Sequence, residues 1–228
     1  MKLNIGITGY TGSLGSIIRK NKSRHNYFYY KEDIQNKEKL LQWFKKNNLN
    51  VIFHLAAIVP IKIVNKNKTK AYKVNYLGTK NLVTISKKFD LKWFFFASTS
   101  HVYRSYKKPI KENFSKFPIS YYGKTKLISE KYIQKNIKNY CIGRIFSTSN
   151  KNQRKNYLVP DLKDKVKKAK KEIILENLNH YRDFISKEDI TKIIYKLLEK
   201  KFIGVINIGS GRSVFLKDIA KLILNKYK

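Results

Sequence analysis

The sequence predicts an α/β fold in which a doubly wound parallel sheet carries helices on both faces. Short apolar runs of strand length alternate with segments of helix length, which is the pattern of parallel strands joined by crossover helices. A glycine-rich turn follows the first apolar run, and sheets of this kind bind ligands at the carboxyl ends of their strands. The length of 228 residues and the hydrophobic content of 42% suit one well-buried domain, or a nucleotide domain with a small lobe.

The first unit is a strand, a glycine-rich turn and a helix. We expect the strand at Leu3–Ile7 and the helix from Ile17 onward, joined by Thr8-Gly9-Tyr10-Thr11-Gly12-Ser13-Leu14-Gly15. Gly9 permits a tight turn, Gly12 lets backbone N–H groups approach a pyrophosphate, and Gly15 lets the helix pack on the strand. An ordinary βα loop is the alternative interpretation of this turn.

The alternation continues to the end of the chain. Further strands are expected at Tyr27–Tyr30, Val51–Leu55, Trp93–Ala97 and Tyr140–Ile145, and helices at Lys37–Lys46, Tyr72–Phe89 and Lys124–Asn136. A polar run at residues 149–153 places a boundary there, so we expect a dinucleotide-binding domain at residues 1–148 and a small lobe at 149–228 that is mixed with closing elements of the first domain. For the second part we predict helices at Asp161–Lys171, Lys187–Lys200 and Leu216–Tyr227, and strands at Ile173–Leu175 and Val205–Ile208.

Four motifs fall at predicted strand ends or on the helices that follow. They are His54-Leu55-Ala56-Ala57, Asn75-Tyr76-Leu77-Gly78-Thr79-Lys80-Asn81-Leu82, Ser98-Thr99-Ser100-His101-Val102-Tyr103 and Tyr122-Gly123-Lys124-Thr125-Lys126. With the glycine-rich turn, they make the chain resemble the extended short-chain dehydrogenase/reductase family, the branch that holds nucleotide-sugar epimerases, dehydratases and reductases. The resemblance runs from Met1 to about Ser147 and reappears at Tyr181-Arg182-Asp183-Phe184 and Asn207-Ile208-Gly209-Ser210-Gly211. It implies a Rossmann-type fold with a small, truncated C-terminal substrate lobe.

The residues themselves indicate acid/base chemistry. Tyr122 and Lys126 are four apart on a predicted helix, so they share one face. A nearby ammonium favours phenolate and would lower the pKa of Tyr122 from ~10 toward neutrality. Thr99 is expected to orient the substrate oxygen, with Ser98 and Ser100 as neighbours that could substitute. The alternatives are a surface tyrosine and a solvated lysine.

The resemblance implies NAD or NADP as cofactor and assigns the residues that would hold it. These are Gly9, Tyr10, Thr11, Gly12, Ser13, Leu14, Gly15, Lys31, Asp33, Ile34, Leu55, Ala56, Ala57, Asn75, Ser98, Tyr122, Lys126 and Ile145. Lys31 could pair with a 2′-phosphate and Glu32 could bind a 2′-hydroxyl, so the choice between the two cofactors stays open. The short second strand is similar to that of the dTDP-4-dehydrorhamnose reductase subgroup.

The implied substrate is a nucleotide-linked sugar, held by Thr99, Ser100, His101, Ser147 and Arg182. Ser100 and His101 stand where the dehydratase branch has an Asp-Glu pair, which disfavours dehydration, and we prefer epimerisation to net reduction. Ser147 takes the place of the family's asparagine. Arg182 can offer a planar fork to phosphate; its alternative is a structural ion pair with Asp183, and the alternative for His101 is a solvated loop histidine.

A net charge of +35 is unusual for an enzyme of this size. It suggests nucleic acid or an anionic membrane surface as a partner, but the lysines are spread from Lys2 to Lys228. The bias toward residues with A/T-rich codons explains much of the charge but not the scarcity of acidic residues, and an electrostatic role toward anionic ligands or surfaces is the alternative. We predict no specific nucleic-acid partner.

Several expectations concern the cellular setting. Met1 leads directly into the first strand and no apolar run approaches the ~20 residues of a membrane span, so a cytoplasmic protein is predicted. Cys141 is expected in the core, and no metal-ligand spacing is present. The resemblance implies a homodimer through the helices after strands three and four. If the short lobe abolishes turnover, the alternative function is an NAD(P)-binding regulatory or scaffold protein; a nucleic-acid-associated protein is a third.

Overall fold

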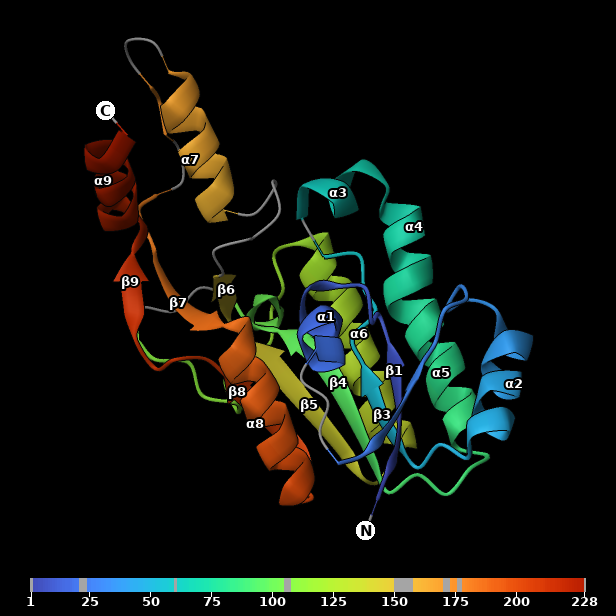
Figure 1. Cartoon of the computed structure of the whole chain (residues 1–228). Coiled ribbons are helices and arrows are strands. Elements are labelled where there is room, and N and C mark those ends of the chain that lie inside the picture. The colour runs from blue at the N-terminus through green and yellow to red at the C-terminus, as the bar shows by residue number, and fades with distance from the viewer. Residues whose placement is uncertain are drawn as a thin grey trace.

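The computed structural model (Figure 1) describes residues 2–20, 24–59, 61–104, 108–149, 158–169, 173–175 and 178–227. Its main feature is a six-stranded sheet in the order β2-β1-β3-β4-β5-β8, in which every neighbouring pair is parallel. The strands are β1 (Asn4–Thr8), β2 (Asn26–Tyr29), β3 (Val51–His54), β4 (Trp93–Thr99), β5 (Tyr140–Ile145) and β8 (Gly204–Ile208). The chain moves from β1 to β2 on one side and then to β3 on the other. The predicted doubly wound parallel sheet is confirmed, with its switch point between β1 and β3.

Helices cover both faces of this sheet. One face packs against α1 (Ser13–Lys20) and α8 (Lys187–Glu199), and the other against α2 (Lys37–Asn47), α5 (Gly78–Ser86) and α6 (Tyr121–Asn136) (Figure 1). Strand β4 shows why the sheet needs two covers. Trp93 and Phe95 belong to the first core and Phe94 and Phe96 to the second, all at most 1% exposed, because successive side chains of a strand point to opposite faces.

The helices begin where polar side chains can cap them. Asn36 accepts a hydrogen bond from Lys39 N at the start of α2, Ser120 Oγ accepts one from Gly123 N at the start of α6, and Ser186 Oγ accepts one from Asp189 N at the start of α8. Each cap satisfies a backbone N–H that has no partner within the helix. Helix α6 therefore begins at Tyr121, three residues before the predicted start.

The helical segment after β3 is more elaborate than the single predicted helix. It consists of α3 (Ile61–Lys66), α4 (Lys68–Tyr72), a π-helical turn at Lys73–Leu77, and α5, which ends at Ser86. Gly78 opens α5 against Ile34, whose Cγ atoms leave no room for a Cβ. Because π-helical turns are rare overall but frequent at functional sites, this turn indicates that the segment belongs to a candidate functional site.

A second, smaller unit follows β5. Strands β6 (Ser147–Ser149), β7 (Tyr181–Ser186) and β9 (Ser213–Phe215) form a sheet in the order β6-β7-β9, with β6 parallel and β9 antiparallel to β7. Helices α7 (Leu158–Lys168) and α9 (Leu216–Tyr227) share an apolar core beside it. Strand β8 and helix α8, although late in the chain, complete the main sheet. The predicted division at residue 148 stays a prediction.

The strand predicted at Ile173–Leu175 is wrong. These residues are not in a strand: Ile173 and Leu175 pack onto the α7 and α9 core, whereas Ile174 is 87% exposed. Alternating burial therefore arises here from packing on helices. Both edges of β7 are already paired with β6 and β9. Of the helix predicted at Asp161–Lys171, residues 170 and 171 lie outside the described residues, as do residues 150–153 of the predicted boundary.

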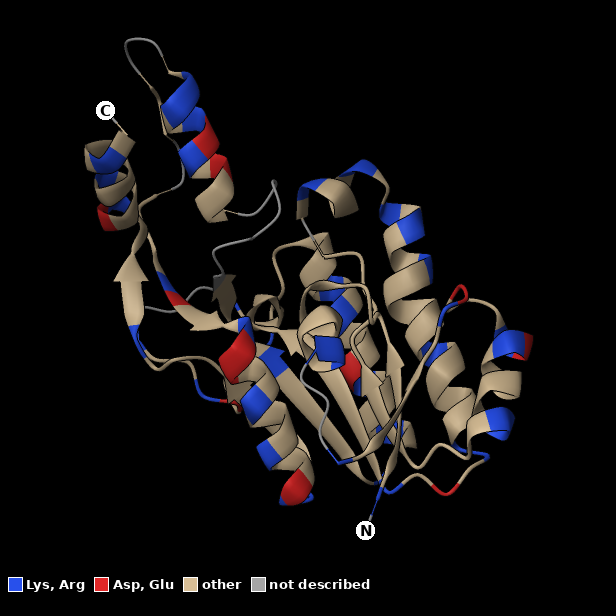
Figure 2. Cartoon of the chain, viewed as in Figure 1, with Lys and Arg blue, Asp and Glu red and all other residues tan. Residues whose placement is uncertain are grey.

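Charge is distributed over the whole molecule rather than gathered on one element. Lysine and arginine occur on the helices of both units and on connecting segments (Figure 2). Cys141 is fully buried, as predicted. None of the helices in the described part of the chain combines the length and the apolar character that crossing a membrane requires.

Candidate active site

Two glycines of the glycine-rich turn are required by the fold, whereas the third has more room around it. Gly9 has φ +72°, a conformation that side chains disfavour, and a Cβ on Gly15 would lie 2.5 Å from Tyr10 Cα. A Cβ on Gly12 would meet only the carbonyl oxygen of Gly9, at 3.1 Å. The neighbours of Gly12 therefore leave nearly enough room for a side chain, and its bareness is explained better by something that binds above the turn.

A cavity of about 320 Å³ opens between this turn, the end of β2 and the end of β3, at the switch point of the sheet. It brings together seven predicted cofactor residues and four others. Its lining is Thr8, Gly9, Tyr10, Thr11, Tyr30, Lys31, Glu32, Asp33, Ile34, Ala56 and Val74. Lys31 and Glu32 both line it, so the 2′-position of a cofactor ribose would meet both charges.

Hydrogen bonds hold the segment that follows β2 beside the cavity. The Asp33 carboxylate accepts hydrogen bonds from Gln35 N (2.9 Å) and Gln35 Nε2 (3.1 Å). The Tyr30 hydroxyl donates to Asp33 O (3.0 Å), and burial raises the pKa of Tyr30 to about 12, so the hydroxyl keeps its proton. Tyr30 was not among the predicted site residues, because a strand tyrosine carries no motif of its own.

A buried chain of neutral hydrogen bonds runs beneath the cavity. His54 Nδ1 lies 2.7 Å from Thr8 Oγ1, and His54 Nε2 lies 2.7 Å from Thr79 Oγ1. The Thr79 hydroxyl donates to Asn75 O (2.7 Å), so it accepts from His54 Nε2–H, and Nδ1 accepts from the Thr8 hydroxyl. Burial, aided by the charge of Lys126, holds the pKa of His54 well below its ordinary 6.5, so the imidazole is neutral.

Asn75, predicted as a cofactor residue, is occupied by the protein itself. Its Oδ1 accepts from Ile58 N (2.7 Å), and its Nδ2 donates to Ile58 O (3.0 Å) and to Thr125 Oγ1 (3.2 Å). The amide thus fastens the segment after β3, which contains Leu55, Ala56 and Ala57, to helix α6. Asn75 shapes this segment, and a direct contact to cofactor stays a prediction.

The predicted acid/base residues come together where β4 ends. Strand β4 runs through Ser98 and Thr99 into a 3-10 turn at Ser100–Val102, and Thr99 Oγ1 accepts from His101 N (3.3 Å). A Cβ on Gly123 would collide with His101 O, so the bare glycine lets α6 dock on this turn. Tyr122 lies beside it, with its ring centroid 6.0 Å from that of His101.

Lys126 lies one helical turn after Tyr122 and is only 1% exposed. Its Nζ lies 3.8 Å from the centroid of the Phe96 ring, and within the described ranges it forms neither an ion pair nor a hydrogen bond. Burial lowers its pKa to about 7, against the charge of Glu130, which raises it. Tyr122 is also buried, so the alternatives of a surface tyrosine and a solvated lysine are wrong.

His101 and Arg182 come from different units, and the charge of Arg182 acts on His101. Burial, together with the charge of Arg182, lowers the pKa of His101 to about 4, so the imidazole is neutral. The side chain is half-buried, and the solvated alternative stays a prediction. Arg182, on β7, donates from Nε to His180 Nε2 (3.3 Å), and burial lowers its pKa. The alternative of a pair with Asp183 is wrong, because that carboxylate accepts from Ser210 N (2.7 Å) and Gly211 N (2.8 Å).

The remaining predicted residues lie around this group. Ser13, Leu14 and Gly15 open α1, and Ile145 ends β5 with 8% exposure. Ser147 begins β6, opposite Phe184 of β7, so it belongs to the smaller sheet. Ser98 Oγ donates to Glu130 Oε1 and therefore faces the protein interior.

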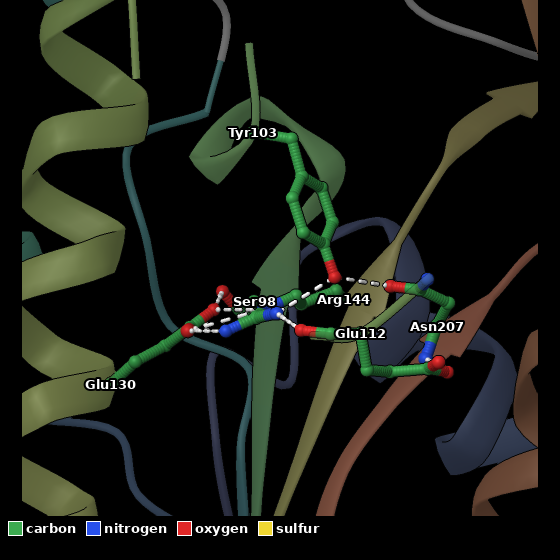
Figure 3. A network of polar contacts seen from close by, with 6 residues as sticks. All are labelled: Ser98, Tyr103, Glu112, Glu130, Arg144 and Asn207. Atoms are coloured by element: carbon green, nitrogen blue, oxygen red, sulfur yellow. Dashed lines mark hydrogen bonds and ion pairs between the residues drawn. The ribbon is translucent and has the colours of Figure 1, made fainter. Parts of the chain in front are cut away.

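Glu130 belongs to a buried network that sequence reasoning missed (Figure 3). Arg144 donates from Nη2 to Glu130 Oε2 (2.7 Å), from Nε to both Glu130 oxygens (3.2 Å each), and from Nη1 to Tyr103 Oη (2.7 Å) and Glu112 O (3.0 Å). Asn207 accepts from Tyr103 Oη (2.9 Å), and its backbone N donates to Glu112 (2.8 Å). The sequence signals were an arginine inside a predicted strand and the motif residues Tyr103 and Asn207.

Residues 5–227 match the sequence profile of the family described as GDP-mannose 4,6 dehydratase. The chain belongs to the extended short-chain dehydrogenase/reductase family, whose members act on nucleotide sugars. A dTDP-D-glucose 4,6-dehydratase of Dictyostelium discoideum is 27% identical over 88% of this chain and 50% of its own length. A GDP-6-deoxy-D-talose 4-dehydrogenase of Aggregatibacter actinomycetemcomitans is 29% identical over 84% of the chain and 66% of its own length.

Solved structures of this extended short-chain dehydrogenase/reductase type share the fold. A dTDP-4-dehydrorhamnose reductase of Clostridium acetobutylicum superimposes with a TM-score of 0.86 at 24% identity, covering 99% of this chain and 80% of its own. A UDP-glucose 4-epimerase of Thermotoga maritima, solved with UDP-glucose, gives 0.83 at 23% identity, covering 99% and 84%. The chain thus spans between half and about two thirds of the two curated relatives, and most of the two solved structures.

Proposed function

We propose that this protein is an NAD(P)-dependent epimerase or reductase that acts on a nucleotide-linked sugar, with Tyr122 as the acid/base. The related enzymes support an enzyme of this general class. Related structures hold the expected cofactors: a dTDP-4-dehydrorhamnose reductase of Bacillus anthracis was solved with NADP, and a UDP-glucose 4-epimerase of Thermus thermophilus with NAD. The bare Gly12 and the cavity between β1 and β3 fit such a dinucleotide.

The observation that carries the proposal is the burial of Lys126. An amine that is 1% exposed, lies over an aromatic ring and forms no hydrogen bond or ion pair within the described ranges is costly for the folded state. Its cost is explained if its donors serve a ligand, such as a cofactor ribose. With its pKa at about 7, the amine also titrates in the range where a neighbouring tyrosine must exchange a proton.

The chemistry then divides between cofactor and protein. The nicotinamide supplies hydride transfer. Tyr122 moves the proton to or from the sugar hydroxyl, Lys126 favours its phenolate form, and the Thr99 hydroxyl orients the substrate oxygen. His101 stays neutral, and Arg182 stays cationic and offers a planar donor to the diphosphate of the substrate.

Dehydration is the least supported of the family's reactions, although the matching profile bears that name. Ser100 and His101 stand in the 3-10 turn where the dehydratase pattern has its acidic pair. A histidine with a pKa of about 4 is a weak acid catalyst at neutral pH because it holds no proton to give. Epimerisation remains preferred to net reduction, and the homodimer through α5 and α6 stays a prediction.

Cofactor binding is tested at the glycine turn. Gly12→Val places a branched side chain where the pyrophosphate would lie, and its Cβ requires the Gly9 carbonyl oxygen, 3.1 Å away, to shift slightly. Calorimetry should show NAD and NADP affinity lost with the melting temperature nearly unchanged. Equal affinity in Gly12→Val and wild type would contradict the proposed binding mode.

Turnover is tested with Tyr122→Phe, which removes only the titrating oxygen. We expect the rate on a panel of UDP-, GDP- and dTDP-sugars to fall ~10²-fold or more, with cofactor affinity retained. Tyr121→Phe, one residue earlier on the same helix, is the matched control and should retain the rate. A wild-type protein that binds NAD(P) but converts no sugar would favour the scaffold alternative.

A further inference from the structure

The Glu130–Arg144 pair is sealed from solvent. Their side chains are 1% and 3% exposed, and the guanidinium meets the carboxylate through two nitrogens. Tyr103 Oη and Glu112 O take the third nitrogen, and Ser98 Oγ donates to the carboxylate (Figure 3). Every nitrogen of the guanidinium is therefore in use, and the pair is held in one geometry.

Stability alone is a poor explanation for such a pair. Moving a charged group from water into a protein interior costs on the order of several kcal/mol per ion. Replacing both partners of a buried pair by apolar residues is therefore often neutral or stabilising. Strands β4 and β5 and helix α6 are already held by two apolar cores. The presence of the pair is therefore better explained by the geometry that it imposes on these elements.

What it specifies is the relative position of the elements that carry the site. Ser98 directly precedes Thr99 on β4, Glu130 follows Lys126 by one turn on α6, and Tyr103 follows the turn that holds His101. The guanidinium of Arg144 on β5 thus links the end of β4, which carries Thr99, to α6, which carries Tyr122. In the proposed reaction the hydroxyl groups of these two residues act on the same substrate oxygen. Sliding α6 along β4 by part of a turn would break several charged hydrogen bonds at once.

Glu130 also acts on Lys126 through charge. Lys126 Nζ lies over the Phe96 ring of β4 and interacts electrostatically with His54 on β3, which is neutral, and with Glu130 on its own helix. Tyr122 lies one turn before it on that helix. Glu130 is the group that raises the pKa of Lys126 against burial. Arg144 fixes where that negative charge lies.

We propose that the Glu130–Arg144 pair is a positioning element for the reaction: it holds α6 in register with β4 and sets the charge that Lys126 experiences. This inference rests on the proposed function for its catalytic consequence. Its consequence for Lys126 holds whether or not the protein turns over a sugar. The two residues touch neither substrate nor cofactor in this scheme and act through Lys126, Tyr122 and Thr99.

The test replaces both charges together, since a single replacement would leave a buried charge unpaired. Glu130→Gln with Arg144→Met keeps an acceptor for Ser98 and removes the ion pair. The control is Asp164→Asn with Lys168→Met, which removes an exposed pair (2.8 Å) of α7. Three quantities are measured: the melting temperature, the titration of the Lys126 amine by NMR of lysine-labelled protein assigned with Lys126→Met, and the pH profile of turnover.

We expect the buried double variant to melt within a few degrees of wild type, while the pKa of Lys126 falls below its wild-type value. The kcat should fall ~10-fold or more with a smaller change in KM, because misplaced catalytic groups affect the reaction more than binding. The control should change none of these quantities.

Two results would overturn the inference. One is a folded double variant whose Lys126 titration and pH profile match wild type. The other is a double variant that does not fold, which would make the pair a support of the fold alone. If wild type itself neither binds NAD(P) nor turns over, the proposed function fails, and the titration still decides whether Glu130 and Arg144 set the charge of Lys126.

Discussion

Two buried polar systems lie beneath the candidate site, and they are built differently. Beneath the cavity between β1 and β3, Thr8, His54 and Thr79 are linked by hydrogen bonds between neutral groups. Where β4 packs on α6, Glu130 and Arg144 form a charged pair with further donors and acceptors around it. Both systems are almost completely buried, and each joins elements that are far apart in the sequence.

The two systems should differ in how much stability is lost when one of their residues is replaced. A neutral chain gives each group one or two partners, so the loss of one residue leaves only neutral groups unsatisfied. A charged pair leaves an ion behind when one partner is lost, which is a much larger penalty. Losing one partner of the neutral system should lower the free energy of unfolding only moderately. Losing one partner of the charged pair should lower it strongly, because the packing of α6 on β4 then buries an unpaired ion.

The comparison is sharpened most strongly by breaking the charged pair on one side only. Arg144→Met leaves the Glu130 carboxylate buried without its cation, and we expect ~3–5 kcal/mol of lost stability in urea unfolding. The control is Lys62→Met, which breaks the exposed pair with Asp161 (3.2 Å), where ~0–1 kcal/mol is expected. Equal effects of the two substitutions would mean that the buried pair is no more demanding than a surface one.

The neutral chain should respond less. His54→Leu leaves the Thr8 hydroxyl without its acceptor and should cost ~1–3 kcal/mol. The control on α5 is Thr84→Val, which removes an exposed hydrogen bond to Tyr132 (3.2 Å) and should stay within ~0.5 kcal/mol.

His54 also predicts a pH dependence. Its folded pKa lies below its ordinary value of 6.5, so the unfolded chain binds the extra proton, and its contribution to stability is lost as pH falls below 6.5. Urea unfolding of wild type at several pH values should show this loss, and His54→Leu should show less of it. The same acid sensitivity in both proteins would contradict a neutral buried imidazole.

The smallest expected effect has the opposite sign. In the absence of cofactor, Lys126→Met removes a buried amine and should raise stability by ~1–2 kcal/mol, as substitutions at sites kept for function often do. Since the folded pKa of about 7 lies below the ordinary 10.5, wild type gains stability as pH rises through this window, so the advantage of the variant should be largest below pH 7. Lys124→Met, on the exposed side of the same helix, is the control. A destabilised Lys126→Met at every pH would show that the amine supports the fold.

How far the sequence predicts the molecule depends on the range of the interactions. Strands such as Trp93–Ala97, the glycine spacing from Gly9 to Gly15 and the four-residue interval from Tyr122 to Lys126 are local patterns. A strand has a period of two and a helix of 3.6, so the side chains that share a face follow from spacing alone. The sheet, both of its covers and the shared helix face of Tyr122 and Lys126 were predictable for this reason.

The rest was decided by contacts between segments distant in the chain. Ile173–Leu175 has the alternation of a strand, but it became a packing segment because β7 had both its edges paired. The effect of the Arg182 charge on His101, and the pairing of Arg144 with Glu130, depend on which strand neighbours which and in what register. The sequence by itself determined most strands and helices of the main sheet and the residue types at the site, because local periodicity dictates them. Only the tertiary structure decided which polar groups lose water together, and that sets the charge states on which the proposed chemistry depends.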